Sequence, residues 1–332
     1  MANVPLLGIT LGDPAGVGIE VTLKALSRLE AVPEVRLLLI GEAAAVKAQM
    51  RFAPEGSVLR PIGDPSEVRW EAGAVQLLDL GRLKEPLALG RVSPEGGESA
   101  FRALERGIEL AQAGEIAGIV TAPLNKEALH LAGHKFDGHT EILSHYCGGL
   151  PSFMLLSSER LKIVHVSTHC SLREACDRAK KPRVLATIRA VHGHLRELGA
   201  GRLTIGVAGL NPHSGENGLF GSEELEEIGP AIEAARAEGI DAEGPVPPDT
   251  LYLKAFRGGY DAVVAMYYDQ GRIPEKLVAF EEAVNVTLGL PVLRTSVDHG
   301  TAFDIAGKGT ADPTNMIAAI AYAARMVQAR QR

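Results

Sequence analysis

Short apolar runs alternate with longer amphipathic segments along most of the chain. The apolar runs, rich in β-branched residues, predict strands at 5–11, 35–40, 118–121, 161–166, 203–207, 262–265 and 292–295. Segments with apolar positions at helical spacing predict helices at 17–29, 98–113, 182–198, 222–238 and 315–328. Strands that alternate with helices in this way are typical of an α/β protein with a largely parallel sheet.

The first strand leads into a glycine-rich turn, GITLGDPAGVGIE, at residues 8–20. The turn is similar to a nucleotide-binding loop, but Gly12, Gly16 and Gly18 do not fit G-x-G-x-x-G, and no Lys-Ser/Thr pair follows them. An ordinary first β-α connection accounts for the pattern equally well. By itself the stretch predicts a strand, a turn that needs permissive backbone, and a helix.

Length and charge narrow the class of protein. The chain has 332 residues, which predicts two domains, and its 46% hydrophobic and 23% charged residues are typical of a folded protein. The net charge is -7 and the Lys and Arg residues are dispersed, so no basic field is available to hold a polyanion. We therefore expect no nucleic-acid partner.

The cysteines and the N-terminus indicate the compartment. Cys147, Cys170 and Cys176 form no C-x-x-C pair, and a chain of this length needs no disulfides to fold. The N-terminus has no basic region before its apolar run, and no segment reaches the roughly 20 apolar residues of a membrane span. We expect a cytoplasmic protein that does not contact a membrane.

Four of the predicted strands are followed by loops rich in reactive side chains: TAPLNKEAL, STHCSLREA, GLNPHSGENG and MYYDQGRIPEK. In open α/β sheets, ligands bind at the carboxyl ends of the strands. Polar loops are common, but four such loops that each carry His, Lys or Asp favour one shared active-site cleft.

Histidines and cations indicate the chemistry of this cleft. His139, His169, His213 and His299 each stand beside Gly, Ser, Thr or Pro, and several histidines together can bind a divalent cation or an anionic substrate. Four basic side chains and one amide beside glycine, proline or strand ends predict a small substrate with more than one negative group. The basic residues are Lys126, Lys276, Arg294 and Lys308, and the amide is Asn285.

The strongest single motif is HGTAFDIAGKGTADP at residues 299–313. It closely resembles the adenine-side cofactor loop of the isocitrate and isopropylmalate dehydrogenases, which bind NAD(P) without a Rossmann fingerprint. The opening GDPAGVGIEVTLKAL is similar to the first β-α turn of the same enzymes. The resemblance implies a set of cofactor-binding residues: His299, Gly300, Thr301, Ala302, Asp304 and Asp312.

Along nearly its entire length the chain resembles the 4-hydroxythreonine-4-phosphate dehydrogenase family, through GDPAGVG, TAPLNK, GHTE, STH, GLNPHSGE, PPDT, AMYYDQG and VNVTLGLPVLRTSVDHGTAFDIAG. This implies two α/β/α domains around a cleft, as in isocitrate dehydrogenase, rather than a Rossmann fold. It also implies oxidative decarboxylation of a 4-phosphorylated 3-hydroxy acid, with NAD as cofactor and NADP as the alternative. The expected substrate is 4-phosphohydroxy-L-threonine, in pyridoxal phosphate biosynthesis.

The resemblance also assigns roles within a homodimer whose active site draws on both subunits. Substrate contacts are implied for His139, Thr140, Lys276, Asn285 and Arg294. His169 and His213 would hold a divalent metal such as Zn, Mg or Co, which lowers the pKa of the reacting hydroxyl and stabilises the enolate. Lys126 and Asp249 are alternatives for the group that relays the hydroxyl proton.

The metal site departs from the family pattern, because Tyr268 stands where that pattern has a third metal-ligating histidine. A tyrosine ordinarily titrates near pH 10 and is a weak ligand until it loses its proton. Three outcomes follow, in order of preference. They are a two-histidine site completed by water and substrate, a tyrosinate ligand at Tyr268, and loss of metal-dependent turnover.

Other substrates and functions stay open. A second departure places Glu281 and Glu282 close to the expected anion site, unless both face solvent. The stretches NGLFGSEE and DQGRIPEK are similar to the sugar-acid branch of the family. That branch oxidises 4-phospho-D-threonate or 4-phospho-D-erythronate to dihydroxyacetone phosphate. A cyclic diol carboxylate dehydrogenase and a non-catalytic ligand-binding homologue are the further alternatives.

Both chain ends are expected to share one domain, because the opening turn and the cofactor loop should lie together. We expect a cofactor-side domain of residues 1–130 plus 290–332. Residues 131–289 would then form the substrate, metal and dimerisation domain.

Overall fold

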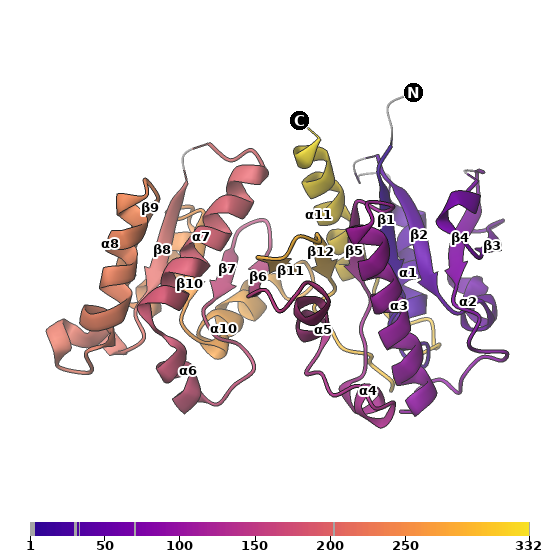
Figure 1. Cartoon of the computed structure of the whole chain (residues 1–332), viewed down its shortest axis with the longest axis horizontal. Helices are drawn as coiled ribbons and strands as arrows, with labels where there is room; N and C mark the ends of the chain where they lie inside the picture. Colours follow the sequence, from indigo (N-terminus) through magenta and orange to yellow (C-terminus); the bar gives the residue numbers. More distant parts are fainter. Residues whose placement is uncertain (1–3, 30–31, 33, 70, 202, 332) are drawn as a thin grey trace. The chain divides into compact units, whose positions relative to one another are not determined.

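The computed structural model describes residues 4–29, 32, 34–69, 71–201 and 203–331. The chain divides into two compact units (Figure 1). Unit 1 is Met1–Pro151 with Leu290–Arg332, and unit 2 is Ser152–Gly289. The first boundary lies at 151 rather than at 130, because helix α5 (His139–Tyr146) places Ile142 and Leu143 in the core of unit 1.

The sheet of unit 1 is parallel throughout, in the order β3-β4-β2-β1-β5-β12. Its strands are β1 (Leu6–Thr10), β2 (Arg36–Gly41), β3 (Val58–Ile62), β4 (Ala74–Asp79), β5 (Gly118–Thr121) and β12 (Arg294–Ser296). Strand β12 comes from the C-terminal segment and pairs with β5, with Arg294 opposite Ile119. Both ends of the chain therefore build this sheet.

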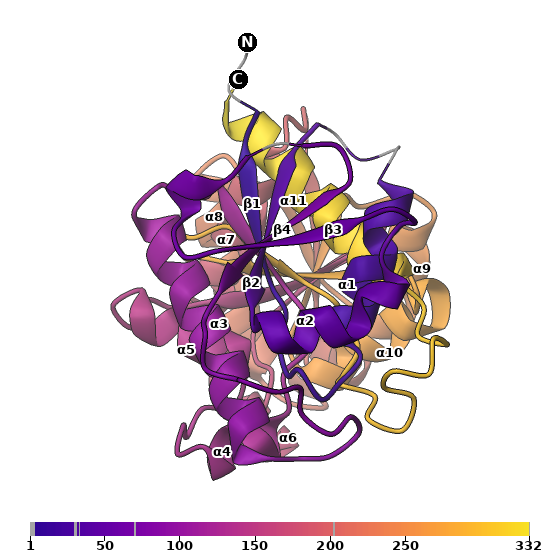
Figure 2. The ribbon, with the colours of Figure 1, turned by 90° about the vertical axis from the view of Figure 1, so that its right-hand side faces the viewer.

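Helices cover both faces of this sheet (Figure 2). Leu38 and Ile40 lie in one core with α3, α4 and α5, whereas the intervening Leu39 lies in another with α1 and α2. The alternation follows from the two-residue side-chain period of a strand. Besides α5, the helices are α1 (Gly18–Ala25), α2 (Ala43–Gln49), α3 (Pro94–Gln112), α4 (Lys126–Leu131) and α11 (Thr314–Arg330), with 3₁₀ turns at Leu26–Arg28, Met50–Phe52 and Pro65–Glu67.

The sheet of unit 2 is mixed, in the order β11-β6-β7-β10-β8-β9. Its strands are β6 (Phe153–Ser157), β7 (Lys162–His165), β8 (Thr204–Ala208), β9 (Asp241–Val246), β10 (Ala262–Ala265) and β11 (Val284–Leu288). Strands β7, β10, β8 and β9 run parallel, whereas β6 is antiparallel to both of its neighbours. The four-residue connection 158–161 is too short for a parallel crossover, so β6 and β7 form a hairpin.

The helices of unit 2 are α6 (Leu172–Arg178), α7 (Lys181–Glu197), α8 (Gly229–Ala237), α9 (Pro248–Phe256) and α10 (Tyr268–Ala279), with a 3₁₀ segment at Pro212–Gly218 and a π-helical turn at Glu224–Ile228. Helix α9 packs Leu251 and Ala255 against Ile163 and Val263 of the sheet. Helix α7 packs against β6, β7 and β10.

One expected loop is a helix. The stretch MYYDQGRIPEK contains Gly271 and Pro274, which favour a loop, yet most of it forms α10. Gly271 is required by packing, because a Cβ there would lie 2.5 Å from His165 Nε2. Pro274 removes one backbone hydrogen bond inside the helix, while the buried Gln270 ties the first turn of α10 to Met266 N and Gly209 O.

Candidate functional site

The last strand of the unit 1 sheet, β12, carries a buried cation, Arg294, which is 2% exposed. Its Nε and Nη2 donate to Oγ1 of Thr121, at 3.1 and 2.7 Å. Thr121 ends β5, so the pairing of β5 with β12 brings these residues together across the sheet. Burial lowers the pKa of Arg294 to about 9, against an opposing contribution from Glu141, and the guanidinium stays charged at neutral pH.

His139, the first residue of α5, lies beside this guanidinium. Desolvation, together with the positive charge of Arg294, holds the pKa of His139 well below its usual range, although part of the side chain remains accessible. The imidazole is thus neutral at pH 7 and hydrogen-bonds the backbone of Ala122. Thr121, His139 and Arg294 are called the anion cluster below.

Lys126 is the first residue of α4, and its side chain lies near Gly138, the residue that precedes His139 of the anion cluster. A Cβ built on Gly138 would lie 4.0 Å from Lys126 Cε and 3.5 Å from Glu141 Oε2. Asn125 caps the same helix, its side chain accepting a hydrogen bond from Ala128 N at 2.8 Å. Lys126, one of the two candidate bases, and the expected substrate ligands His139 and Arg294 therefore belong to one region of unit 1.

The cofactor loop, residues 299–313, is packed on the opening glycine-rich turn. Val17 N donates to Thr301 O at 3.0 Å, and a Cβ on Gly16 would lie 2.9 Å from that same oxygen. Gly16 is therefore needed for close approach between the two segments. The opening turn therefore packs directly against residues 299–313.

His299 is placed to receive a ligand. Its Nδ1 donates to Gly300 O at 2.9 Å, and its Nε2 is buried without a hydrogen-bond partner among the described residues. In the neutral tautomer this leaves Nε2 as an acceptor for a ligand hydroxyl or amine. The cofactor loop thus fits a dinucleotide, whose ribose and adenine carry such groups.

The two acidic residues of this loop differ. Asp304 is exposed, whereas Oδ1 of Asp312 accepts hydrogen bonds from N and Oγ1 of Thr314, at 2.8 and 2.6 Å. These bonds lower the pKa of Asp312 and secure the start of α11. Ala302 has a left-handed backbone, with φ of 40°.

In unit 2, His169, Tyr268 and His213 follow the adjacent parallel strands β7, β10 and β8. Their loops are tied together by hydrogen bonds. Ser167 Oγ donates to Met266 O at 2.9 Å, and Gln270 bridges Met266 N and Gly209 O, at 2.6 and 2.7 Å. The ring centroids of His169 and Tyr268 are 5.7 Å apart.

The loop that carries His213 has an unusual backbone. Every residue from His213 to Asn217 has positive φ, between 43° and 79°. The buried carboxylate of Glu224 supports the loop by accepting from Leu210 N and Asn211 N, at 2.8 and 2.7 Å. Strained backbone held in this way is typical of binding sites.

These three residues supply an incomplete donor set for a metal. Among the described residues, no group of three His, Cys, Asp or Glu side chains could hold a metal ion. His169 and His213 offer two strong donors, and the third position is the phenol of Tyr268.

The remaining expected site residues are spread over unit 2 and α5. Lys276 lies in the last turn of α10, with its ammonium 5.1 Å from the Phe280 ring centroid. Asn285 on β11 has a buried Oδ1 without a hydrogen-bond partner among the described residues. Asp249 is exposed in the first turn of α9, and Thr140 is the half-buried second residue of α5.

Three residues near these clusters escape the sequence prediction: Thr121, Glu141 and His165. Thr121 and Glu141 stand in the quoted motifs TAPLNK and GHTE, beside residues that were selected. His165 lies within an apolar strand, where burial lowers its pKa to about 4 and leaves the ring neutral. Its Nε2 is buried without a hydrogen-bond partner in the described part of the chain.

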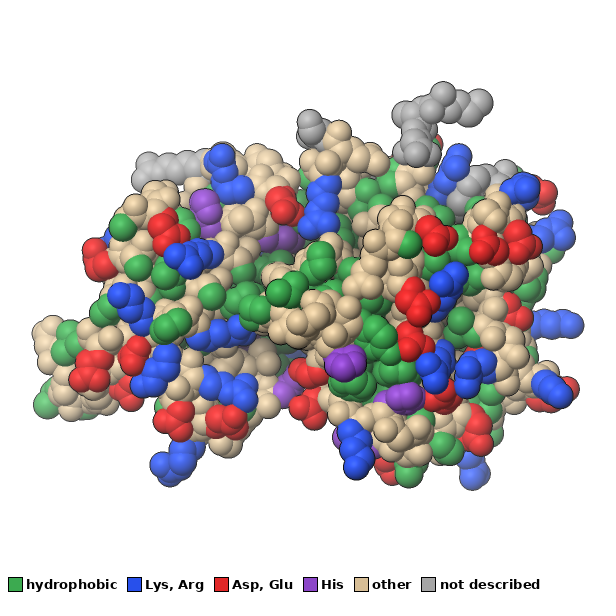
Figure 3. All heavy atoms as spheres, in the orientation of Figure 1, with side chains coloured by type: hydrophobic (Ala, Val, Ile, Leu, Met, Phe, Trp, Pro, Cys, Tyr) green, Lys and Arg blue, Asp and Glu red, His purple; other side chains and the backbone are tan. Residues whose placement is uncertain are grey.

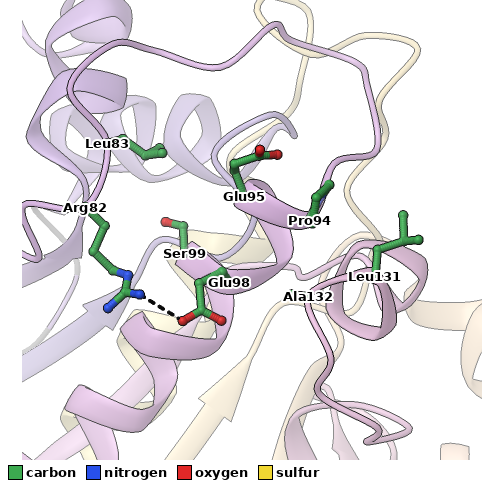
Figure 4. Close-up of a pocket in the computed structure, with 8 residues that line it drawn as sticks. All are labelled: Arg82, Leu83, Pro94, Glu95, Glu98, Ser99, Leu131 and Ala132. Carbon is green, nitrogen blue, oxygen red and sulfur yellow. Dashed lines mark hydrogen bonds and ion pairs between the residues drawn. The ribbon is translucent and has the colours of Figure 1, made fainter.

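A cavity of about 440 Å³ opens elsewhere in unit 1, between α3 and α4 (Figure 4). Its wall includes the ion pair of Arg82 Nη2 with Glu98 Oε1, at 3.0 Å, and the exposed Leu131. None of its lining residues is among the expected site residues. The anion cluster, rather than this cavity, carries the expected chemistry.

On the face shown in Figure 3, acidic and basic side chains are interspersed. Over the described ranges, no helix has both the length and the apolar character that a membrane span requires.

Comparison with known proteins decides the family. The model for "Pyridoxal phosphate biosynthetic protein PdxA" matches residues 34–323. The chain belongs to this family. It is 46% identical over 328 residues to D-threonate 4-phosphate dehydrogenase of Cupriavidus necator, with 98% of each chain covered. It is thus an oxidoreductase, as the sequence predicts.

Two further relatives carry a different substrate name. 4-Hydroxythreonine-4-phosphate dehydrogenase of Beijerinckia indica is 45% identical over 321 residues, covering 96% of this chain and 94% of the relative. The crystal structure of 4-hydroxythreonine-4-phosphate dehydrogenase from Klebsiella pneumoniae superposes with a TM-score of 0.88, at 43% identity, covering 98% and 99% of the two chains. This confirms the predicted α/β fold.

Proposed function

We propose that this enzyme catalyses NAD-dependent oxidative decarboxylation of a 4-phosphorylated 3-hydroxy acid, with 4-phospho-D-threonate as its substrate. The anion cluster is the main support for this proposal, because Thr121 fixes the buried, charged Arg294 beside a neutral His139. Such a guanidinium matches the two oxygens of a carboxylate or phosphate. The name of the Cupriavidus relative supports the choice of acid.

The reaction follows from the substrate's own chemistry. The dinucleotide, when bound, accepts the hydride from C3. The hydroxyl proton passes to a base, and the resulting β-keto acid loses carbon dioxide. A proton then returns to the carbon that held the carboxylate, which gives dihydroxyacetone phosphate. Arg294 and His139 orient the acid, and Lys276 is the proposed second anion ligand.

Lys126 and Asp249 are the proposed alternatives for the base. The position of Lys126 near Gly138, next to His139, favours Lys126. A loss of the rising, acid-side limb in the pH profile of kcat for Lys126→Met, with the profile of Asp249→Asn unchanged, supports this assignment. The reverse result assigns the role to Asp249.

NADH formation tests the proposed function. Purified enzyme is incubated with NAD and, in turn, with 4-phospho-D-threonate, 4-phospho-D-erythronate and 4-phosphohydroxy-L-threonine. We expect the highest kcat/KM with the first acid and dihydroxyacetone phosphate as product. Absence of NADH with every acid contradicts the proposal, and the same series with NADP tests the choice of dinucleotide.

A second substrate, 4-phosphohydroxy-L-threonine, is favoured by the names of the Beijerinckia and Klebsiella relatives. It carries an amino group where the sugar acid has a hydroxyl. The same series of acids separates the two, because a higher kcat/KM for the amino acid assigns the enzyme to pyridoxal phosphate synthesis.

His169 and His213 are the proposed metal ligands, with water and substrate completing the site. Calorimetric titration of substrate-free enzyme with Zn²⁺ measures the Kd of this metal site. Replacing Tyr268 with His supplies a stronger third donor, so we expect binding to tighten by at least about tenfold. Equal affinity of both proteins excludes position 268 from the metal site.

We also propose a homodimer. Helix α10 exposes Ile273, Leu277 and Val278, with Leu277 79% exposed, and the exposed Phe280 follows its last residue. Ile273 and Leu277 are one helical turn apart and therefore lie on the same face. Apolar residues exposed together are typical of protein interfaces.

A further inference from the structure

Glu20 on α1 is a buried carboxylate that contacts the far end of the chain. Its side chain is 0% exposed. Oε1 accepts from Ala311 N at 3.0 Å, and Oε2 accepts from Gly309 N at 3.3 Å. Both amides belong to the cofactor loop, nearly 300 residues away in sequence. The carboxylate therefore holds the loop by its backbone, whatever side chains the loop carries.

Lys24, one turn later on α1, holds the carbonyls of the same two residues. Its Nζ donates to Gly309 O at 2.8 Å, to Ala311 O at 2.7 Å and to Glu20 Oε1 at 2.8 Å. An ammonium has three protons, so all three are used. Glu20 and Lys24 together therefore bind both the N–H and the C=O of Gly309 and of Ala311.

A third contact extends the pattern. Arg51 Nη2 donates to Gly307 O at 2.9 Å, and a Cβ on Gly309 would lie 3.3 Å from the Phe52 ring. Anchored residues therefore occur at every second position, 307, 309 and 311. The intervening Lys308, Thr310 and Asp312 are exposed.

We propose that Glu20 and Lys24 are positioning residues that hold the cofactor loop in its dinucleotide-binding conformation. The inference rests on the proposed function of that loop. Gly307 and Gly309 have φ of 72° and 77°, a region that glycine enters freely, so the loop without its anchors has many alternative conformations. Ordering it in advance removes that entropic cost from binding.

The test measures the Kd for NADH on substrate-free enzyme by the change in nucleotide fluorescence. We expect Lys24→Met to raise the Kd about tenfold, and Lys24→Arg to restore most of the affinity. The control is Lys47→Met, which changes an exposed lysine on the neighbouring helix α2. Hydrogen exchange should become faster in peptides that span 307–312 for Lys24→Met only.

Steady-state kinetics separates positioning from general damage. In Lys24→Met, KM for the dinucleotide should rise about tenfold while kcat and KM for the phosphorylated acid stay near wild type. Should that variant fail to fold, Arg51→Met removes an exposed outer anchor, and we expect a two- to threefold rise in Kd.

The outcomes are distinguishable. Wild-type affinity for NADH in Lys24→Met, or in Arg51→Met where it takes its place, overturns the positioning role and leaves the proposed function intact. No NADH binding by wild-type enzyme overturns the proposed function and this inference together. A fall in kcat with unchanged Kd also overturns the positioning role.

Discussion

Asp13, in the opening turn, is fully buried against the start of α3. Its Oδ1 accepts from Ala15 N at 2.9 Å, and a Cβ on Gly96 would lie 2.7 Å from that oxygen. Oδ2 is buried without a hydrogen-bond partner in the described ranges. Burial raises the pKa of Asp13 to about 6, against the lowering effect of its bond to Ala15.

This pKa predicts a pH-dependent contribution to stability. Because the folded state binds the Asp13 proton more tightly than the unfolded state, the carboxyl lowers the free energy of unfolding as pH rises from about 4 to about 6, by roughly 2–3 kcal/mol. Asp13→Asn should remove this contribution. Urea unfolding followed by circular dichroism at both pH values measures it, and parallel behaviour of variant and wild type contradicts it.

At Thr121, loss of the hydroxyl should weaken substrate binding selectively. Thr121→Val keeps the shape of the side chain and removes the oxygen that accepts from Arg294. We expect kcat/KM for the phosphorylated acid to fall at least about tenfold, with the Kd for NADH unchanged.

A matched control lies on the partner strand. Thr295→Val removes a hydroxyl that donates to Ala319 O at 2.9 Å, and it should lower stability without changing KM for the acid. Equal kinetic effects of the two substitutions would mean that Thr121 acts only through stability.

Among the structural elements, the left-handed segment His213–Asn217 predicts opposite effects for neighbouring substitutions. Glu216 is exposed with φ of 43°, so Glu216→Gly should stabilise by about 0.5–1 kcal/mol. Gly215→Ala should destabilise by more than that, because a Cβ would lie 2.7 Å from Glu224 Oε2. Thermal unfolding of both variants tests the pair, and a lower Tm for Glu216→Gly refutes the strain argument.

The elements also show how far the sequence could predict the structure. Strands β5 and β10 match the expected ranges, because their apolar runs are short, buried and bounded by polar loops. Strand β3 was missed because this edge strand is largely exposed and has no apolar run. Helix α10 was missed because local glycine and proline signals conflict with its packing.

The same limit applies to the site. The sequence predicts substrate contacts for His139 and Arg294, but the hydrogen bond that fixes Arg294 depends on the pairing of β5 with β12. Residues 121 and 294 are far apart in sequence, so no local pattern could bring them together. Sequence identified the charged group, and only the topology identified its partner.

At the scale of the whole molecule, the exposed apolar face of α10 predicts the oligomeric state. Leu277→Glu places a charge at the proposed dimer contact, and we expect the mass in solution, measured by light scattering after gel filtration, to fall from dimer to monomer. Leu131→Glu is the control, because Leu131 is 58% exposed on α4 of unit 1. A wild-type enzyme that is already monomeric refutes the dimer.

The return of the C-terminal segment to unit 1 sets an order of events during synthesis. Unit 2 is one continuous stretch and can complete its sheet as soon as residue 289 has left the ribosome. Unit 1 begins first but finishes last, since β5 keeps an unpaired edge until β12 arrives, and α11 then packs on both strands. For as long as translation of unit 2 takes, that open edge is a template for pairing with other nascent chains.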